Sequence, residues 1–308
     1  MAVPRDCRFT AWMLRRTLVI ALVALAAPAA ASASELIDRN ATGVRIGAND
    51  KGEALLTYRA SGKLKNVLAW GAVNAVAPNP AGRQLEFKLD YAGGWGKYRR
   101  AYAKEFKSTC GAYRGQELQW FVTGCTARDG SHWAVQAWQR ALPNYGLAPT
   151  AKQAVWELRL SHWTGELPVL TINLDWSYRR FHHLYGTYAY AGNPVFGYRS
   201  TSGGVPLDTF GRNVYLDTFG SAYGSGWKRE NSFLTHTRTG TFCYGFYDHG
   251  SRPEGNGTRY RATIIGPGVT PDAYWQGTAQ GPYDPDADRA DLDRQREMLA
   301  GDRLCKAL

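Results

Sequence analysis

Hydrophobic and polar positions alternate over much of the chain, in short runs separated by Gly, Asn and Asp. The pattern is clearest in residues 154–163 and 169–177, and it recurs in 116–124 and 131–139 on either side of the turn residues Asp129–Gly130. Side chains of a strand point alternately to opposite faces, so period-two runs predict antiparallel sheet. Roughly a dozen such runs are too many for one short sheet. We therefore expect a mainly β protein with an antiparallel β-sandwich or jelly-roll-like body.

Two stretches depart from this alternation and predict helices. Tyr98, Tyr102 and Phe106 recur every four residues, which aligns them on one helical face. Most of the remaining positions are basic: Lys97, Arg99, Arg100, Lys104 and Lys107. We therefore expect a short basic helix that binds an anionic surface. Residues 284–308 predict a C-terminal helix, with Asp284 and Asp286 as candidate caps.

The first 33 residues have the three-part layout of a secretory signal peptide. Its basic head contains Arg5, Arg8, Arg15 and Arg16. An apolar run over 17–27 and small residues at 31–33 follow, which suits cleavage after Ala33. An uncleaved membrane anchor is the alternative. No later run reaches roughly 18 apolar residues, so we expect a secreted or cell-envelope-associated protein without a transmembrane segment after signal removal.

The charge of the chain is consistent with an anionic partner. Removal of residues 1–33 takes away four arginines and Asp6, a net charge of +3, so +8 of the formal +11 remains. An exported basic protein is not expected to meet nucleic acid, and anionic envelope polymers or acidic polysaccharides are its natural counterparts. The alternative is that the charge only keeps the protein in solution.

Cysteine usage agrees with export. Cys7 belongs to the signal peptide, and the other four cysteines are Cys110, Cys125, Cys243 and Cys305. An even number in an oxidising compartment predicts disulfides, and four cysteines allow three pairings. We favour Cys110 with Cys125, and Cys243 with Cys305, which would tether the C-terminal helix. Zinc-binding spacings are missing, so we expect no metal and no cofactor.

Prolines and a glycine between residues 142 and 153 form the best internal break. The break separates two lobes or is a long loop within one domain. On the two-lobe interpretation the chain comprises a signal peptide (1–33), a first β-rich half (34–145), a second β-rich half (154–283) and the C-terminal helix (284–308).

Acidic and imidazole side chains gather in the second half. A hairpin with the preceding strand would place Asp175 opposite Glu157 in one register, at a spacing that resembles the carboxyl pair of a retaining glycosidase. If residues 181–190 form a strand, His182 and His183 point to opposite faces, so at most one of them joins Asp175. Glu230 is a further candidate for a catalytic carboxylate. The alternative is a solvated polar face with an Arg–carboxylate pair.

Aromatic residues are abundant: 11 Trp, 18 Tyr and 11 Phe, against three Met. Two of the rings lie in a Gly- and Ser-rich segment, where little apolar surface is available to bury them. Exposed rings beside hydrogen-bonding side chains suit stacking on a sugar, whereas burial against the sheet is the alternative. The predicted ligand-binding residues are Tyr223, Trp227, Lys228, Arg229 and Asn231.

We therefore expect non-catalytic binding to cell-envelope or extracellular polysaccharide. A secreted glycan-acting hydrolase is the alternative, with its catalytic groups among Asp175, Glu230, His182 and His183. A structural or protein-binding surface protein is the third hypothesis. The sequence contains no nucleophile elbow, metalloprotease motif or phosphate-binding loop, so it does not favour any one reaction class.

Overall fold

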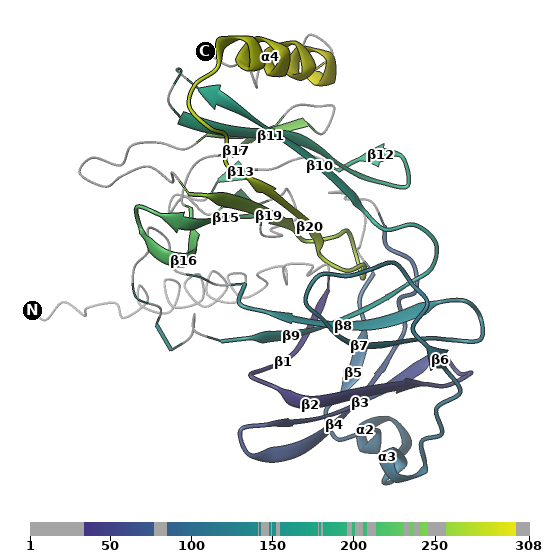
Figure 1. The fold of residues 1–308 in the computed structure, drawn as a ribbon. Coiled ribbons are helices and arrows are strands. Elements are labelled where there is room, and N and C mark those ends of the chain that lie inside the picture. Colours follow the sequence, from purple (N-terminus) through teal and green to yellow (C-terminus); the bar gives the residue numbers. More distant parts are fainter. Residues whose placement is uncertain are drawn as a thin grey trace, which may run out of the picture. The chain divides into compact units, whose positions relative to one another are not determined.

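The computed structural model is mainly β, with several antiparallel sheets and a C-terminal helix, which confirms the expected fold class (Figure 1). It describes residues 34–76, 85–140, 142, 148, 150–151, 155–177, 179, 181–195, 199–200, 206–207, 214–230, 234–236, 241–245 and 257–299. In this part of the chain no helix is both long and apolar enough to cross a membrane. The predicted signal peptide lies outside the described residues, and the predicted division into two halves stays a prediction.

Two sheets are built from strands that lie between residues 35 and 163. Sheet A has the order β1-β9-β8-β7-β6 and sheet B the order β2-β3-β4-β5. The strands of sheet A are β1 (Glu35–Arg39), β6 (Gly111–Ala112), β7 (Phe121–Thr126), β8 (His132–Trp138) and β9 (Glu157–Trp163). Those of sheet B are β2 (Thr42–Ala48), β3 (Glu53–Ala60), β4 (Lys63–Trp70) and β5 (Lys88–Asp90).

Alternation in these strands creates the first hydrophobic core. Leu56 of β3 and Val67 of β4 are buried from sheet B, and Trp133, Val135 and Leu160 are buried from sheet A. All five belong to one cluster, so the two sheets pack face to face as a sandwich.

Two further sheets come from the second half. Sheet D has the order β10-β11-β18-β17, with β12 paired to β11, and sheet C has the order β16-β15-β19-β20. The strands of sheet D are β10 (Val169–Ser177), β11 (Phe181–Tyr190), β12 (Asn193–Pro194), β17 (Leu234–His236) and β18 (Thr241–Gly245). Those of sheet C are β15 (Val214–Ser221), β16 (Gly224–Arg229), β19 (Arg259–Ile264) and β20 (Ala273–Thr278). A separate pair is formed by β13 (Arg199–Ser200) and β14 (Pro206–Leu207).

The second core lies between sheets C and D. Ile172 and Leu184 of sheet D pack in one cluster with Leu216, Tyr260 and Ile264 of sheet C. Only one face of each sheet is used in this way, so side chains on the opposite face of sheet C are available for other contacts.

The segment between β19 and β20 contacts sheet A. The carbonyl of Val269 accepts a hydrogen bond from the backbone of His162 at 3.0 Å. Asp272 accepts a bond from the indole of Trp138 at 3.0 Å and one from the hydroxyl of Ser34 at 3.0 Å.

The C-terminal helix α4 (Pro285–Leu299) confirms the expected element. Asp284 caps it, because its carboxylate accepts the backbone N–H groups of Asp286 at 2.9 Å and Ala287 at 3.2 Å. The helix lies across β10 and β11 (Figure 1). Its contact with the sheet includes a hydrogen bond from the Tyr185 hydroxyl to the carbonyl of Asp291 at 3.0 Å.

The expected basic helix is interrupted. It consists of two four-residue helices, α2 (Trp95–Tyr98) and α3 (Tyr102–Glu105). Arg99 follows α2 with φ of 57°, in the left-handed region that ends a helix. The aromatic rings still meet, since the ring centroids of Tyr98 and Tyr102 are 4.2 Å apart.

The hairpin suggested between residues 154–163 and 168–177 is wrong. Strand β9 pairs with β1 and β8 in sheet A, whereas β10 pairs with β11 in sheet D. All seven residues of β9 are buried and both of its edges are occupied, so β10 has no edge of this strand to join. Glu157 and Asp175 therefore lie in different sheets.

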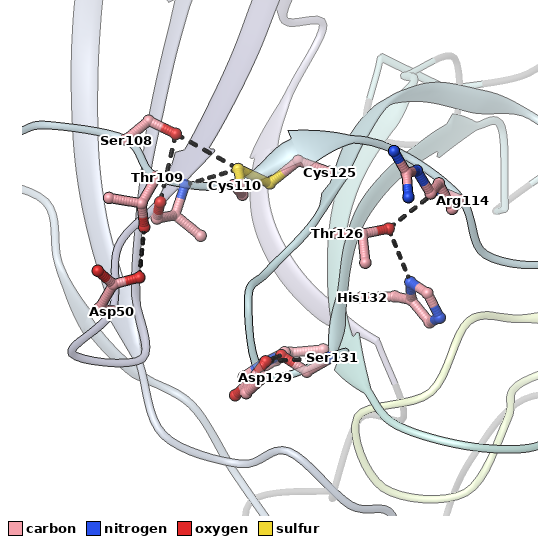
Figure 2. Close-up of a disulfide and its surroundings, with 12 residues drawn as sticks. Asp50, Ser108, Thr109, Cys110, Arg114, Cys125, Thr126, Asp129, Ser131 and His132 are labelled. Atoms are coloured by element: carbon pink, nitrogen blue, oxygen red, sulfur yellow. Dashed lines mark hydrogen bonds between the residues drawn. A yellow bond between two sulfur atoms is a disulfide. The ribbon is translucent and has the colours of Figure 1, made fainter.

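The first predicted disulfide is present, between Cys110 and Cys125 (Figure 2). It joins the segment that leads into β6 to β7. Cys243 is also disulfide-bonded, and Cys305, its predicted partner, lies outside the described residues.

Candidate functional site

The outer face of sheet C gathers arginines and aromatic rings. Trp227 of β16 pairs with Phe219 of β15, and Phe219 also pairs with Arg259 of β19. Arg261, two residues further along β19, is opposite Asp217. Paired residues and residues two apart share a face, so these side chains form one row on the face opposite the core.

The glycine-rich hairpin lets this row form. Gly220 has φ of 62° and lies where the β15–β16 register shifts, as in a bulge. The shift keeps the Phe219–Trp227 pair in register while the chain turns through residues 222–223. The two rings meet edge to face with centroids 5.3 Å apart.

Guanidinium groups lie over the rings. The Cζ atom of Arg259 is 4.1 Å from the ring centroid of Phe219, and that of Arg261 is 4.4 Å from the centroid of Trp227. Such cation–π contacts contribute about 0.5–1 kcal/mol at exposed sites and about 2 when desolvated. Rings and cations therefore hold one another in place.

A buried carboxylate fixes the inner arginines. Asp217 is fully buried and accepts Nε–H bonds from Arg229 at 2.5 Å and from Arg261 at 2.7 Å. Arg229 also donates to the carbonyl of Arg140 at 2.8 Å. One carboxylate against two guanidinium groups leaves a positive charge. Within the described residues no carboxylate is within ion-pair distance of Arg259, which adds another.

Further rings extend the row toward sheet A. Trp120, which precedes β7, meets Tyr274 of β20 edge to face at 4.9 Å and stacks on Trp138 at 4.4 Å. The guanidinium of Arg261 lies 5.7 Å from the Trp120 ring. We call this surface the arginine–aromatic face; its half-buried members are Trp120, Phe219, Trp227, Arg259, Arg261 and Tyr274.

The predicted ligand-binding residues are divided by this geometry. Trp227 lies on the arginine–aromatic face, and Tyr223 lies half-buried in the adjoining turn. Lys228 pairs with Thr218, so its side chain belongs to the other face of the sheet. Arg229 is buried in its bonds to Asp217, and Asn231 lies outside the described residues.

Sequence reasoning missed five of the six members of this face: Trp120, Phe219, Arg259, Arg261 and Tyr274. The signal for the two arginines was the alternation Arg–Tyr–Arg at residues 259–261, which places both on the face opposite buried Tyr260. Nothing local marked Trp120, because its ring partners Trp138 and Tyr274 are distant from it in the sequence.

Among the predicted acid–base groups, Asp175 and His183 are brought together. They pair across β10 and β11, and the Nδ1 atom of His183 lies 2.6 Å from a carboxylate oxygen of Asp175. Asp175 is fully buried, and its other oxygen has no hydrogen-bond partner among the described residues. A histidine oriented by a carboxylate is the arrangement of a general base.

His182 points to the opposite face, as expected for adjacent strand residues. Its Nδ1 atom is hydrogen-bonded to the hydroxyl of Tyr260, and burial lowers the pKa of His182. Glu230 belongs to the same inner side of sheet C, where it accepts a hydrogen bond from the Thr218 hydroxyl. Burial, with the nearby Asp217 charge, raises the pKa of Glu230 to about 8. Asp175 and Glu230 therefore lie on different sides of sheet D and form no carboxylate pair.

Two of the basic residues in the predicted anion-binding segment form ion pairs within the protein. Lys97 donates to buried Glu53 at 2.7 Å, and Arg100 is 3.3 Å from Glu105. Burial raises the pKa of Glu53, but hydrogen bonds, chiefly the one from Lys97, lower this pKa to about 2. The other basic residues of the segment are exposed: Arg99, Lys104 and Lys107.

Comparison with protein families, with curated proteins and with solved structures gives no match for this chain. Among the described residues no group of three or more His, Cys, Asp or Glu side chains is placed to hold a metal ion. The function must therefore be argued from the geometry of these surfaces.

Proposed function

We propose that this protein is exported and binds an acidic polysaccharide on the arginine–aromatic face, without cleaving it. The observation that supports this most is the row in which Arg259 and Arg261 lie over half-exposed rings of Phe219 and Trp227. The layout of residues 1–33 supports export.

Both parts of the face match the chemistry of an acidic sugar. Guanidinium groups bind carboxylates and sulfates through paired, charge-assisted hydrogen bonds. Aromatic rings pack against the C–H face of a pyranose, as in other ligand sites that combine rings with a few polar groups. A neutral glycan would use only the rings, so the arginines favour an acidic one.

Pre-organisation lowers the cost of binding. Arg261 is held by Asp217 and by the Trp227 ring, so little side-chain freedom remains to be lost on contact with a ligand. The net charge of the chain after signal removal adds long-range attraction, which salt screens over about 8–10 Å at physiological strength.

The test is affinity electrophoresis of the full chain through gels containing polygalacturonate, alginate or neutral dextran. We expect retention by the acidic polymers and little by dextran. Trp227→Ala and Arg259→Gln should each weaken retention about tenfold or more, equivalent to about 1.4 kcal/mol. Hydrogen bonds to charged groups are worth about 1.5–3 kcal/mol, which sets this expectation for the arginine.

The chain offers matched controls for both variants. Lys228→Gln removes one positive charge from the residue next to Trp227 but on the other face of the sheet, so it should change retention less than twofold. Trp156→Ala removes an indole that is 50% exposed elsewhere, and should have no effect. Equal losses for the face and control variants would contradict the proposal.

A second candidate function is hydrolysis of a glycan by the Asp175–His183 pair, and the 2.6 Å contact between them is the observation that favours it. In that case the protein should release reducing ends from the bound polymer, and His183→Gln should reduce the rate about 10²–10⁴-fold. Recovery of unshortened polymer after long incubation would exclude this candidate. If no polymer is retained at all, a structural or protein-binding role remains.

A further inference from the structure

A separate pocket lies beside the Cys110–Cys125 disulfide. It has a volume of about 320 Å³ and is formed by the β2–β3 and β7–β8 turns. Its lining includes Asp50, Arg128, Asp129, Ser131 and Trp133. Figure 2 shows three of these, Asp50, Asp129 and Ser131, around the disulfide, with Asp129 and Ser131 drawn next to each other below it.

The serine of this pocket, Ser131, lies within hydrogen-bond distance of a histidine. The Nε2 atom of His162 is 3.0 Å from the hydroxyl oxygen of Ser131, and its Nδ1 atom is 3.2 Å from the carbonyl oxygen of Gly71. A carbonyl can only accept, so it favours the proton on Nδ1. That tautomer turns the lone pair of Nε2 toward the serine hydroxyl.

The surroundings keep this imidazole neutral and fixed. His162 pairs with Trp133 across β8 and β9 and stacks on its ring, with the centroids 3.5 Å apart. Burial lowers the pKa of His162 to about 4, although the Asp129 charge opposes the shift. At neutral pH the ring is therefore neutral and can accept a proton, but a pKa of about 4 makes it a weak base.

We propose that Ser131 is a nucleophile and His162 its general base, in an esterase site that opens into this pocket. The proton of the Ser131 hydroxyl passes to Nε2 while the oxygen bonds to the acyl carbon of an ester. The ester C–O bond then breaks, and the proton on Nε2 goes to the departing alcohol. Water, activated by the same nitrogen, releases the acid and restores Ser131.

Asp129 influences this reaction from the other side of the serine. Its carboxylate oxygen is 2.6 Å from the Ser131 hydroxyl oxygen. It competes with His162 for the hydroxyl proton, which slows attack, but it also faces the imidazolium that forms and stabilises that charge. Asp129→Asn removes the second effect and keeps an amide oxygen as acceptor.

Stabilisation of the oxyanion is the weak part of this site. The N–H of Gly130 donates to Ala127, and that of Ser131 donates to Asp129, so neither is available to a substrate. Arg128, the cation in the pocket lining, is paired with Asp50 at 3.1 Å and would have to leave that pair to take this role. Loss of one oxyanion donor costs about 10²–10³ in rate, so we expect slow turnover and a more sensitive readout from covalent capture.

The test is reaction of the folded full chain with a fluorophosphonate probe, followed by intact-mass analysis and peptide mapping. We expect one adduct, on Ser131. His162→Gln, which retains a polar side chain but no base, should lower the labelling rate about 10²–10⁴-fold. Ser108→Ala removes a hydroxyl near the disulfide and should be labelled like the wild type.

Mapping on the wild-type protein decides the matter even if a variant does not fold. No adduct, an adduct on another residue, or wild-type labelling of a folded His162→Gln protein would each overturn the proposal. Slow hydrolysis of p-nitrophenyl acetate that is lost in Ser131→Ala would support it further. The proposal does not depend on polysaccharide binding, because the pocket and the arginine–aromatic face share no residue.

Discussion

Glu230 is 3% exposed directly after β16, and burial raises its pKa to about 8. In the unfolded chain the same carboxyl has a pKa of about 4.5. Between these two values the folded protein holds a proton that the unfolded chain has lost. The contribution of Glu230 to the free energy of unfolding is therefore fully present below about pH 4.5. It is lost as the pH rises toward 8.

The size of the effect follows from the two values. One pKa unit corresponds to 1.36 kcal/mol, so a difference of about 3.5 corresponds to about 4–5 kcal/mol as an upper bound. Glu230→Gln has no proton to lose and keeps an oxygen that accepts the Thr218 hydrogen bond. The variant should match the wild type near pH 4.5 and exceed its stability by several kcal/mol near pH 8.

The assay is denaturant unfolding of both proteins at half-unit steps from about pH 4.5 to about 8.5, with Glu117→Gln at an exposed position as the control. Other groups affect the absolute curves, but the difference between wild type and Glu230→Gln isolates this carboxyl. If that difference is the same at every pH, Glu230 does not have a raised pKa and the description of its surroundings is wrong.

Three further predictions concern other parts of the molecule. The pKa of Glu53 lies at about 2, so its ionised carboxylate stabilises the folded state by about 3 kcal/mol above about pH 4.5, and this stabilisation is lost as the pH falls toward 2. In unfolding measurements, Glu53→Gln should lower the free energy of unfolding by this amount at pH 7 and leave it unchanged near pH 2. The paired changes Cys110→Ser and Cys125→Ser should lower the free energy of unfolding by about 3 kcal/mol, because the bond closes a segment with a sequence separation of 15; an unchanged unfolding midpoint would refute this. Changing Arg99 and Arg100 to Glu should reduce retention on polygalacturonate at low salt but not at about 1 M salt, where the screening length is about 3 Å; an equal reduction at both would contradict a purely long-range effect.

Period-two alternation was enough to predict the strands β7, β8 and β9 of sheet A and β10 of sheet D. Turn residues also gave a correct boundary: Asp129 and Gly130 lie between β7 and β8, and Gly130 has φ of 85°. Strand pairing could not be obtained in this way. Only five residues separate β9 from β10, yet they belong to different sheets, because β9 lies between β1 and β8. Alternation defines the faces of a strand but not its neighbours.

The candidate sites depended even more on pairing. Trp227 was predicted from its glycine-rich surroundings, but its arginine partners lie more than 30 residues further along the chain and meet it only through β15. Ser131 and His162 are 31 residues apart and fit no motif. The interruption of the basic helix at Arg99 also has no signal in the four-residue spacing of its aromatic residues.

Hydrogen–deuterium exchange of the full chain, with and without an oligogalacturonate, is the most direct test of where an acidic polysaccharide binds. The arginine–aromatic face consists mainly of sheet C, so we predict slowed exchange in residues 214–230 and 257–278. Trp227→Ala should abolish this protection, and Lys228→Gln should not. Protection confined to residues 95–107, or no protection anywhere at saturating ligand, would contradict the proposed binding face.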